Sequence, residues 1–491
     1  MTLSKQYYPR KDAEQKLMRF LEASVISAQL VFFRGRRRLG KSLMLKYIQS
    51  DYPRKCFYFS GALDESGKHT LERFATSWSK FCTSSELGYT KESMLSWSYI
   101  FEKIREEIKQ RTEDTWIFFD EIQWLARSKN GFLGLFKEAW LELEKIPKLK
   151  IILCGSSNKF FVDNTGGEEK ILRGLVTHSD IFLRPFLTSE VKEYYGKNLS
   201  DEEVIFLYLC FGGIPYYLKQ FDFTLGFING FNRAVFLQST IFDSEVNELL
   251  NLDFNSRGIT TSLKIFIAFK QRSSTLDVIR KNSRFAPSTL TEAMGKLMQY
   301  GFIKELEPVV EKIKDNLNNI SLYYTDFYLH FFCRFLKNQL IKIRKNIDSN
   351  LFSNYLSSKG NLYIENFTGI AFENYIQFLI ENDHRDSNLL NELEIRNDED
   401  FSIISDAQSD IVLRTKSLKL IRYIECKWTN SGEVIEEGIR QLACIDINKY
   451  KEYKMYHAAK FLITTMQVSD RIANNAQRMG IKIIILKLRS M

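Results

Sequence analysis

The first part of the chain alternates short apolar runs with longer amphipathic stretches. Each run has four or five residues and ends at a polar or glycine-containing segment, which is typical of a buried strand. The runs are residues 30–33, 56–60, 116–119 and 150–154. Helical periodicity lies between them, near residues 68–83 and 94–111. This alternation predicts a parallel α/β sheet within residues 1–195.

The pattern beyond residue 195 is mainly helical. Residues 201–218 predict a helix that runs into the turn formed by Gly212, Gly213 and Pro215. Residues 261–325 predict two helices, a turn, a third helix and a hairpin, which together make a winged helix. A stretch rich in Ser and Asn then predicts a linker that ends near residue 360.

The third helix of this predicted winged helix begins at Ser288, behind Pro287. It carries the cation Lys296 and the acid Glu292, whereas a helix that reads a DNA groove is usually more basic. We therefore favour a role as an internal switch or packing element. Direct DNA reading is the alternative.

Length and composition limit the class of protein. The 491 residues are too many for one hydrophobic core and suggest about three domains. The chain is 44% hydrophobic and contains only 7 Pro, so we expect a globular protein with well-filled cores. Its 69 Lys and Arg outnumber its 60 Asp and Glu and give a net charge of +9, a mild excess that is compatible with a nucleic-acid partner.

The sequence also indicates the compartment. The N-terminal residues lack the apolar core of a signal peptide, and the longest apolar stretch, 204–218, is too short and too broken by glycine and proline to span a bilayer. The seven cysteines form no Cys-x-x-Cys pair, which favours reduced, buried thiols over disulfides or zinc. We expect a soluble, cytoplasmic protein that spans no membrane.

A phosphate-binding loop follows the first apolar run. Gly35 and Gly40 let the backbone curl so that its N–H groups face an anion, and the next helix points its positive end at the same place. Lys41 would reach the β- and γ-phosphates, and Ser42 would ligand Mg²⁺. The sequence thus predicts ATP and Mg²⁺ as cofactors. The nucleotide-binding residues of this loop would be Gly35, Arg36, Arg37, Arg38, Leu39, Gly40, Lys41, Ser42 and Leu43.

Two acids end the apolar run 116–119. Asp120 would hold the Mg²⁺ ion, and Glu121 would polarise the attacking water as the general base. An acidic pair after an apolar run is common, but this pair follows the phosphate loop in the order and at a distance that such a site needs. We interpret the two segments as one ATP-hydrolysing centre.

The apolar run 150–154 leads to small polar residues. In the predicted sheet this strand lies beside the acidic strand, so Ser157 and Asn158 are candidate sensors of the γ-phosphate, or ordinary turn residues. Arg173 and Arg184 are candidates for a charge on the developing phosphate, although most arginines are surface residues.

Four residues near the C-terminus suggest a second site. Glu373 lies on a predicted helix, Asp410 opens one strand, and Glu425 and Lys427 alternate along another, so their side chains share a face. A hairpin would bring Asp410 beside Glu425. The carboxylates of Glu373, Asp410 and Glu425 would then bind Mg²⁺, and Lys427 would orient or deprotonate a water for attack on a phosphodiester. A salt-bridged pair of strands without metal is the alternative.

The first half of the chain resembles the archaeal-type ATPases of the AAA+/STAND superfamily. The resemblance rests on the phosphate loop 35–42 and on the segments 119–125, 153–157 and 212–218, which occur in the family's order. It implies a helical lid at the Gly212-Gly213-Ile214-Pro215 turn. The sequence departs from the family in two features, because Arg173 precedes Gly174 instead of following a glycine, and because the N-terminal nucleotide motif is reduced to Tyr8-Pro9-Arg10.

The C-terminal region, about 365–490, resembles the PD-(D/E)XK nuclease superfamily, and specifically the nuclease-like domain that follows archaeal-type ATPase modules. The resemblance includes Gln441 on the helix after Lys427. The proline that usually precedes the first acid is absent, since Gln408 and Ser409 stand before Asp410. A degenerate nuclease fold that does not cut is a further reading.

Together these features predict a multidomain α/β protein. Its parts would be a P-loop ATPase core (1–195), a helical lid (196–258), a winged helix (259–340) and a restriction-endonuclease-like domain (360–491). The nucleotide state would control a nucleic-acid-directed, Mg²⁺-dependent nuclease-like domain with DNA as the candidate partner, and an oligomer is compatible with this layout. The rival interpretation is a signalling ATPase whose C-terminal domain binds DNA or protein without cutting it.

Overall fold

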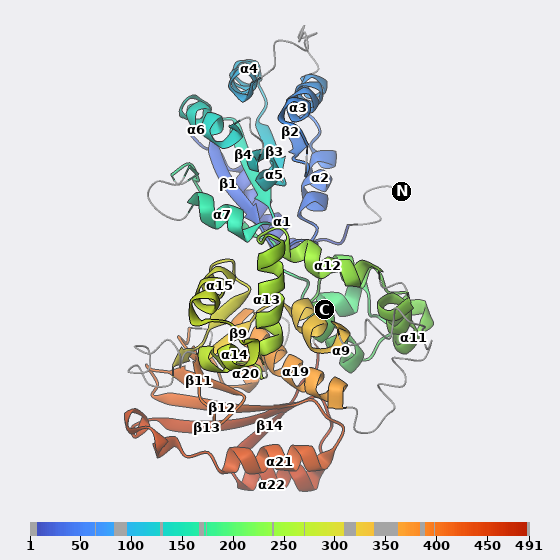
Figure 1. Ribbon diagram of the computed structural model, residues 1–491, viewed down its shortest axis with the longest axis vertical. Coiled ribbons are helices and arrows are strands. Elements are labelled where there is room, and N and C mark those ends of the chain that lie inside the picture. The colour runs from blue at the N-terminus through green and yellow to red at the C-terminus, as the bar shows by residue number, and fades with distance from the viewer. Residues whose placement is uncertain are drawn as a thin grey trace. The chain divides into compact units, whose positions relative to one another are not determined.

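The structure is a computed structural model. It describes residues 7–63, 65–82, 96–127, 131–165, 171–172, 174–237, 240–269, 271–308, 321–337, 362–382, 388–396 and 398–488. Contacts divide the chain into two compact units, Met1–Pro185 and Phe186–Met491, and each is described by itself (Figure 1).

The first unit is built on a five-stranded sheet in which every pair of neighbouring strands is parallel. The strand order is β2-β3-β4-β1-β5. The strands are β1 (Gln29–Arg34), β2 (Cys56–Ser60), β3 (Thr115–Asp120), β4 (Leu149–Gly155) and β5 (Ile181–Phe182). The predicted parallel α/β sheet is therefore confirmed. The strand predicted beside the acidic strand is β4, and it separates β3 from β1.

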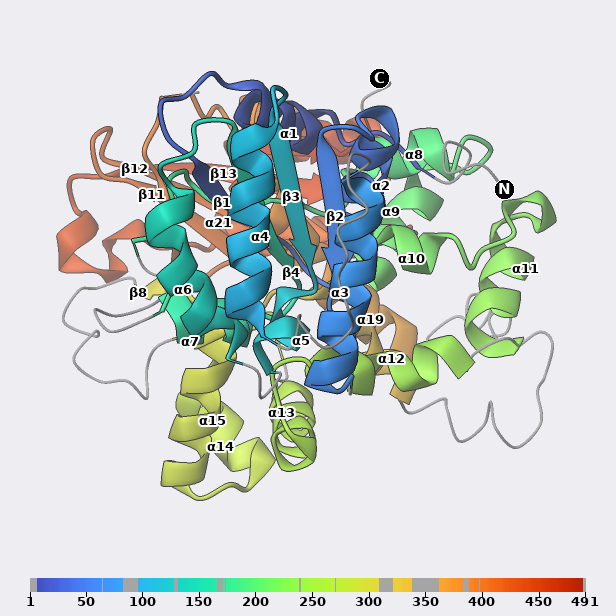
Figure 2. The same ribbon diagram turned by 90° about the horizontal axis from the view of Figure 1, so that it is seen from above.

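Helices cover both faces of this sheet because alternate strand residues are apolar on each side. Three helices lie on one face of the sheet (Figure 2). Their buried aromatic side chains there include Phe74, Trp97 and Phe136. These helices are α3 (Gly67–Phe81), α4 (Trp97–Gln110) and α6 (Phe132–Leu143). The other helices of the unit are α1 (Lys11–Glu22), α2 (Lys41–Asp51), α5 (Ile122–Arg127) and α7 (Asn158–Thr165).

The second unit begins with helices. They are α8 (Thr188–Tyr194), α9 (Asp201–Phe211), α10 (Pro215–Leu218), α11 (Phe227–Phe231) and α12 (Thr240–Leu250). Gly212 ends α9 in a left-handed conformation, and a Cβ on Gly213 would lie 2.3 Å from the carbonyl oxygen of Phe186. Pro215 opens α10. These local requirements explain the Gly-Gly-Ile-Pro sequence without any ligand.

A small helical module follows. It contains α13 (Ser256–Ala268), α14 (Leu276–Ser283) and α15 (Pro287–Gln299), and a three-stranded sheet in the order β6-β9-β7. These strands are β6 (Ser274–Thr275), β7 (Ile303–Glu305) and β9 (Ser321–Tyr324). Helix α16 (Phe327–Phe331) comes next. The arrangement matches the predicted order of helices and hairpin.

The C-terminal part forms a six-stranded mixed sheet in the order β14-β13-β12-β11-β10-β8. Its strands are β8 (Glu307–Pro308), β10 (Ser402–Ser405), β11 (Ile411–Thr415), β12 (Leu420–Lys427), β13 (His457–Thr464) and β14 (Ile481–Ile485). Helices α21 (Gly432–Ala443) and α22 (Asp470–Arg478) pack on one face, and α19 (Leu362–Asn382) lies against β12 on the other side (Figure 1). The short α20 (Leu389–Glu392) follows α19.

Two boundaries differ from those expected. The first compact unit ends at Pro185 instead of residue 195, because Phe186 already belongs to the second unit, where its N–H donates a hydrogen bond of 2.9 Å to the carbonyl oxygen of Gly213. Strand β8, which lies within the range expected for the winged helix, pairs in parallel with β10 and so belongs to the C-terminal sheet. The expected linker lies outside the described residues.

Two further expectations concern the whole chain. Within the described ranges, no helix is long and apolar enough to cross a membrane. All seven cysteines are free, and six of them are buried while Cys444 is exposed. The expectation of buried thiols therefore holds for six of the cysteines, and Cys444 is the exception.

Candidate functional site

The phosphate loop joins β1 to α2 at the carboxyl edge of the first sheet. Three of its residues have positive φ angles: Gly35 at 153°, Arg38 at 74° and Gly40 at 95°. A Cβ on Gly35 would lie 2.6 Å from the carbonyl oxygen of Leu183, so only glycine fits there. The loop thus curls immediately before a helix whose first-turn N–H groups are available to an anion.

Lys41 is buried at the start of α2. Its Nζ donates hydrogen bonds to the carbonyl oxygens of Gly35 at 2.7 Å and Arg36 at 3.0 Å. Burial lowers the pKa of Lys41, whereas the nearby acids Asp120 and Glu121 raise it. The ammonium group therefore lies inside the curve of the loop and within the field of the acidic pair.

Asp120 ends β3 and its side chain is buried. One carboxylate oxygen accepts a hydrogen bond of 2.6 Å from the hydroxyl of Tyr58 on β2, and the other accepts one of 2.9 Å from the backbone N–H of Glu121. Two neighbouring strands thus fix the direction of this carboxylate.

Glu121 is the first residue after β3 and has an unusual φ of 48°. Its carboxylate accepts hydrogen bonds from the side-chain amide of Gln123 and, at 3.4 Å, from the hydroxyl of Ser156 at the end of β4. Burial and the charge of Asp120 raise the pKa of Glu121. A positive φ in a non-glycine residue is often found at functional positions, and it turns this carboxylate toward the β4 edge.

The other residues predicted for this site lie in different surroundings. The hydroxyl of Ser157 accepts a hydrogen bond of 3.1 Å from the N–H of Phe160, so it caps α7, which begins at Asn158. Ser42 and Leu43 are half-buried in the first turn of α2. The carbonyl oxygen of Arg184 accepts a hydrogen bond from the Arg10 guanidinium. Arg173 lies outside the described residues.

The predicted C-terminal residues are brought together by the β11–β12 hairpin. Ile411 pairs with Ile424, a register that sets Asp410 against Glu425 at the end of the ladder. A carboxylate oxygen of Asp410 accepts a hydrogen bond of 2.8 Å from the N–H of Cys426. Burial and the charge of Asp410 raise the pKa of Glu425.

Lys427 lies between these two acids. Its Nζ is 2.7 Å from Glu425 and 3.9 Å from Asp410. Burial alone would lower the pKa of Lys427, but the two carboxylates raise it. A Cβ on Gly438 of α21 would lie 2.9 Å from Cε of Lys427, so this glycine makes room for the lysine chain.

Glu373 joins the cluster from α19. Burial and the charge of Asp410 raise its pKa, while the charges of Arg272 and Lys427 oppose this. Nε of Arg272 lies 3.9 Å from the Glu373 carboxylate. We call the set of Glu373, Asp410, Glu425, Lys427 and Arg272 the C-terminal cluster.

The C-terminal cluster does not fit a metal ion in this arrangement. Across the described residues, no group of three or more His, Cys, Asp or Glu side chains is arranged to hold one. The reason is visible in the contacts, because Glu425 is turned toward Lys427 and Glu373 toward Arg272. The carboxylates therefore pair with the protein's own cations.

Three site residues, Arg272, Gln123 and Gln377, were not predicted from the sequence. Gln123 follows the acidic pair by two positions, so its proximity to Glu121 could have been noticed. Arg272 stands 138 positions before Asp410, in a segment with no motif, and no local signal could have found it. Gln441, included by resemblance, lies on α21 with an exposed side chain.

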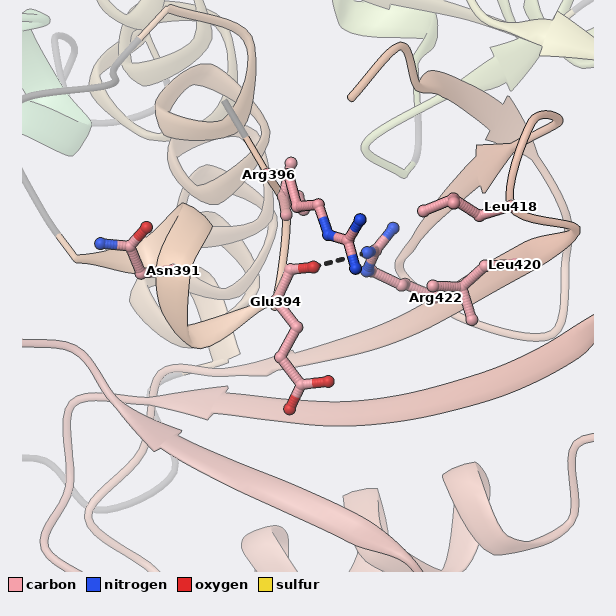
Figure 3. A pocket seen from close by; sticks show the side chains of 7 residues that line it. Asn391, Glu394, Arg396, Leu418, Leu420 and Arg422 are labelled. Carbon is pink, nitrogen blue, oxygen red and sulfur yellow. Dashed lines mark hydrogen bonds between the residues drawn. The ribbon is translucent and has the colours of Figure 1, made fainter. Parts of the chain in front are cut away.

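A polar cavity of about 570 Å³ opens on the face of β12 opposite Glu425 and Lys427, because Leu420 and Arg422 alternate with those residues. Figure 3 shows the guanidinium groups of Arg396 and Arg422 pointing toward each other. Arg422 is 1% exposed and pairs with Glu399 at 2.6 Å. The cavity is lined by Asn391, Glu394, Ile395, Arg396, Leu418, Leu420 and Arg422.

Comparisons with known proteins agree with the geometry of the first unit. Residues 8–221 match the family described as "ATPase domain predominantly from Archaea". No curated protein matches the chain. The solved Walker-type ATPase PABY2304 of Pyrococcus abyssi is 20% identical with a TM-score of 0.50, and the match covers 67% of this chain and 97% of that chain.

A second solved structure, the Aeropyrum pernix ORC2 protein in its ADPNP–ADP complexes, is 10% identical with a TM-score of 0.41 over 72% of this chain and 98% of that chain. The likeness to the Pyrococcus protein shows a common fold, and the family match defines the first part of the chain. The chain therefore contains an archaeal-type P-loop ATPase domain.

Proposed function

We propose that the chain binds ATP with Mg²⁺ at the loop 35–42, hydrolyses it, and uses the nucleotide state to control a nucleic-acid-directed C-terminal domain. The observation that carries the first part is that Lys41 is buried inside the phosphate loop and lies within the electrostatic reach of Asp120 and Glu121. The ammonium group and both carboxylates interact electrostatically at the carboxyl edge of one parallel sheet. This edge is where ligands bind in open α/β sheets.

The residues at this edge fit a Mg²⁺ ion that arrives with ATP. The hydroxyl of Ser42 and the fixed carboxylate of Asp120 are hard oxygen donors, which Mg²⁺ prefers, and phosphate and water would complete the set. The ion would neutralise phosphate charge in the transition state. Asp120 needs no rearrangement for this role, because Tyr58 and the Glu121 N–H already orient it.

Glu121 is the residue that would activate water. Burial and the charge of Asp120 raise the pKa of Glu121, which makes its ionised carboxylate a better proton acceptor than that of an ordinary glutamate. Gln123 and Ser156 hold the carboxylate through hydrogen bonds. The backbone N–H groups of the loop and Lys41 would bind the phosphates and stabilise the charge that develops on them.

Steady-state ATP hydrolysis by the full chain tests this proposal. We expect Mg²⁺-dependent turnover in the wild type, a loss of binding in Lys41→Ala, and retained binding with lost turnover in Glu121→Gln. Turnover unchanged in Lys41→Ala would contradict the assignment of the site.

For the second unit we propose a winged helix and a PD-(D/E)XK-like domain. The order of α13, α14, α15 and the three-stranded sheet supports the first, and the β11–β12 hairpin that carries Asp410, Glu425 and Lys427 on one face supports the second. The winged helix would serve as a packing element. Support comes from β7 and β9, because Lys304 and Tyr323 contact Glu381 of α19 at 3.4 Å and 2.8 Å.

A cleavage assay separates the nuclease from the rival function, a signalling ATPase with a non-cutting tail. Single-stranded, duplex and branched DNA would be incubated with Mg²⁺ or Mn²⁺, with and without ATP. Lys454 is the matched control, because Glu452 and Lys454 show the same spacing as Glu425 and Lys427 but are exposed. Cleavage lost in Lys427→Ala and kept in Lys454→Ala supports the nuclease.

No cleavage by the wild type, with ATP turnover intact, supports the signalling ATPase. One observation favours this rival, namely that Glu373 and Glu425 pair with Arg272 and Lys427 instead of converging on one point.

A further inference from the structure

Arg272 is a buried cation inside the C-terminal cluster. It lies between α13 and β6, in the helical module, and only 7% of its side chain is exposed. Its Nη2 donates a hydrogen bond of 2.5 Å to the main-chain oxygen of Asp410, and its Nη1 donates one to the side-chain oxygen of Gln377. Nε faces Glu373 at 3.9 Å. One side chain thus contacts both α19 and the start of β11.

The arginine is held in place by a polar network on α19. Gln377 donates a hydrogen bond of 2.6 Å to Glu381, whose other oxygen lies 3.4 Å from Lys304 of β7. The hydroxyl of Tyr323 on β9 donates to Glu381 at 2.8 Å. The helical module therefore contacts α19 at two places, through Arg272 and through its small sheet, so the position of Arg272 depends on the position of the whole module.

The charges of the C-terminal cluster oppose the binding of a divalent cation. The three carboxylates of the cluster already face two cationic groups, Arg272 and Lys427, whose side chains are 7% and 18% exposed. Partial burial strengthens the interaction between these charges. A divalent cation on the same carboxylates would stand beside a fixed guanidinium of like charge. Removal of the guanidinium would leave three acids facing Lys427 alone, and a bound cation or protonation would neutralise the remaining charge.

We propose that Arg272 is a latch that closes the C-terminal cluster to divalent cations, so that a cation binds there only when the segment carrying Arg272 moves away. The proposal rests on the proposed nuclease-like function of this domain and adds its regulation. The position of the helical module, and not the concentration of divalent cations, then decides whether the C-terminal cluster can bind a cation.

Titration of the nucleotide-free full chain with Mn²⁺ tests the latch without any assay of activity. We expect Arg272→Ala and Arg272→Gln to bind one Mn²⁺ per chain more than the wild type, and the added substitution Asp410→Asn to abolish the gain. Arg280, an exposed arginine on α14 that pairs with Asp277, is the matched control, and Arg280→Ala should bind as the wild type does.

A second titration tests the proposal in chains that keep Arg272, so it does not depend on whether the Arg272 variants fold. Because the latch closes the cluster, Asp410→Asn alone should leave wild-type Mn²⁺ binding unchanged, and a decrease would overturn the proposal. It would also be overturned if folded Arg272 variants bind no additional Mn²⁺, or if the gain survives Asp410→Asn. The titration contains neither ATP nor DNA, so its outcome is separate from the ATPase and cleavage assays that test the proposed function.

Discussion

The molecule contains two acidic sites of similar composition, and their surroundings differ. In each, a strand ends near two carboxylates and a lysine: Asp120 and Glu121 with Lys41, and Asp410 and Glu425 with Lys427. Lys41 hydrogen-bonds to backbone carbonyls of its loop, whereas Lys427 pairs directly with Glu425 at 2.7 Å. The same residue types therefore contact the backbone of a loop in the first site and contact one another in the second.

The difference comes from the backbone. At the first site, three positive φ angles shape a loop in front of a helix, and the Lys41 ammonium lies inside the curve of that loop. The C-terminal cluster has no such loop, and its carboxylates are balanced by Lys427 and by Arg272 from another module. Acids at a strand end are thus insufficient to define a metal site, because their neighbours decide what neutralises them.

The largest effect is expected from a substitution that disrupts the first site. Lys41→Ala should lower kcat/KM for ATP by about a thousandfold, since it removes the charge that binds the phosphates in a water-poor site. Lys46 lies on the same helix with an exposed side chain, so Lys46→Ala should keep near-normal turnover. Phosphate release measured for both variants checks this, and equal losses would contradict it.

Glu121→Gln tests the role of the second acid at the same site. Because the amide cannot accept a proton, kcat should fall by about 10² to 10⁴-fold while ATP affinity stays within a few-fold of the wild type. Nucleotide binding followed by fluorescence and turnover measured on the same sample separate the two quantities. Retained turnover would assign the base to another residue.

The third test concerns the buried ion pair of Arg422 and Glu399. Arg422 and Glu399 are almost fully buried, so Arg422→Leu should lower the free energy of unfolding of the C-terminal unit by about 3 kcal/mol, because it leaves an unpaired carboxylate. Arg440 pairs with Glu437 on the surface. Arg440→Leu should therefore change the free energy of unfolding by less than about 0.5 kcal/mol. Urea denaturation of the two variants measures the difference.

The Glu399 pair also has a defined pH dependence. Burial raises the pKa of Glu399, but hydrogen bonds from Arg422 and Thr415 outweigh this and lower it. A lowered pKa contributes stability above the unfolded-state value of about 4.3, and this stability is lost as pH falls through the folded value. The destabilisation by Arg422→Leu should therefore be smaller at acid pH than at pH 7, and an equal effect at both would contradict the pairing.

The smallest effect concerns a positioning residue of the first site. Gln123→Leu removes one hydrogen bond to Glu121, so kcat should fall by about three- to tenfold, a cost of ~1 kcal/mol. Gln110, exposed at the end of α4, is the control, and Gln110→Leu should leave kcat unchanged. An unchanged kcat in Gln123→Leu would show that Ser156 and the backbone suffice to orient Glu121.

The parts of the molecule that sequence could predict are those set by short-range patterns. Apolar runs and glycine spacing gave the parallel sheet and the loop around Lys41, and strand alternation gave the shared face of Glu425 and Lys427. The edge strand β8 was not predicted, because two residues carry no periodicity and their pairing with β10 is set only by tertiary folding. Arg272 escaped for the same reason, since its contacts join segments that are distant along the chain.

The measurement that tests the account most directly is the number of Mn²⁺ ions bound per chain with and without a non-hydrolysable ATP analogue. We predict one binding event that requires the analogue and is lost in Asp120→Asn, and no nucleotide-free binding that depends on Asp410. Binding without nucleotide that disappears in Asp410→Asn would contradict the account, because it would make the C-terminal cluster an open metal site.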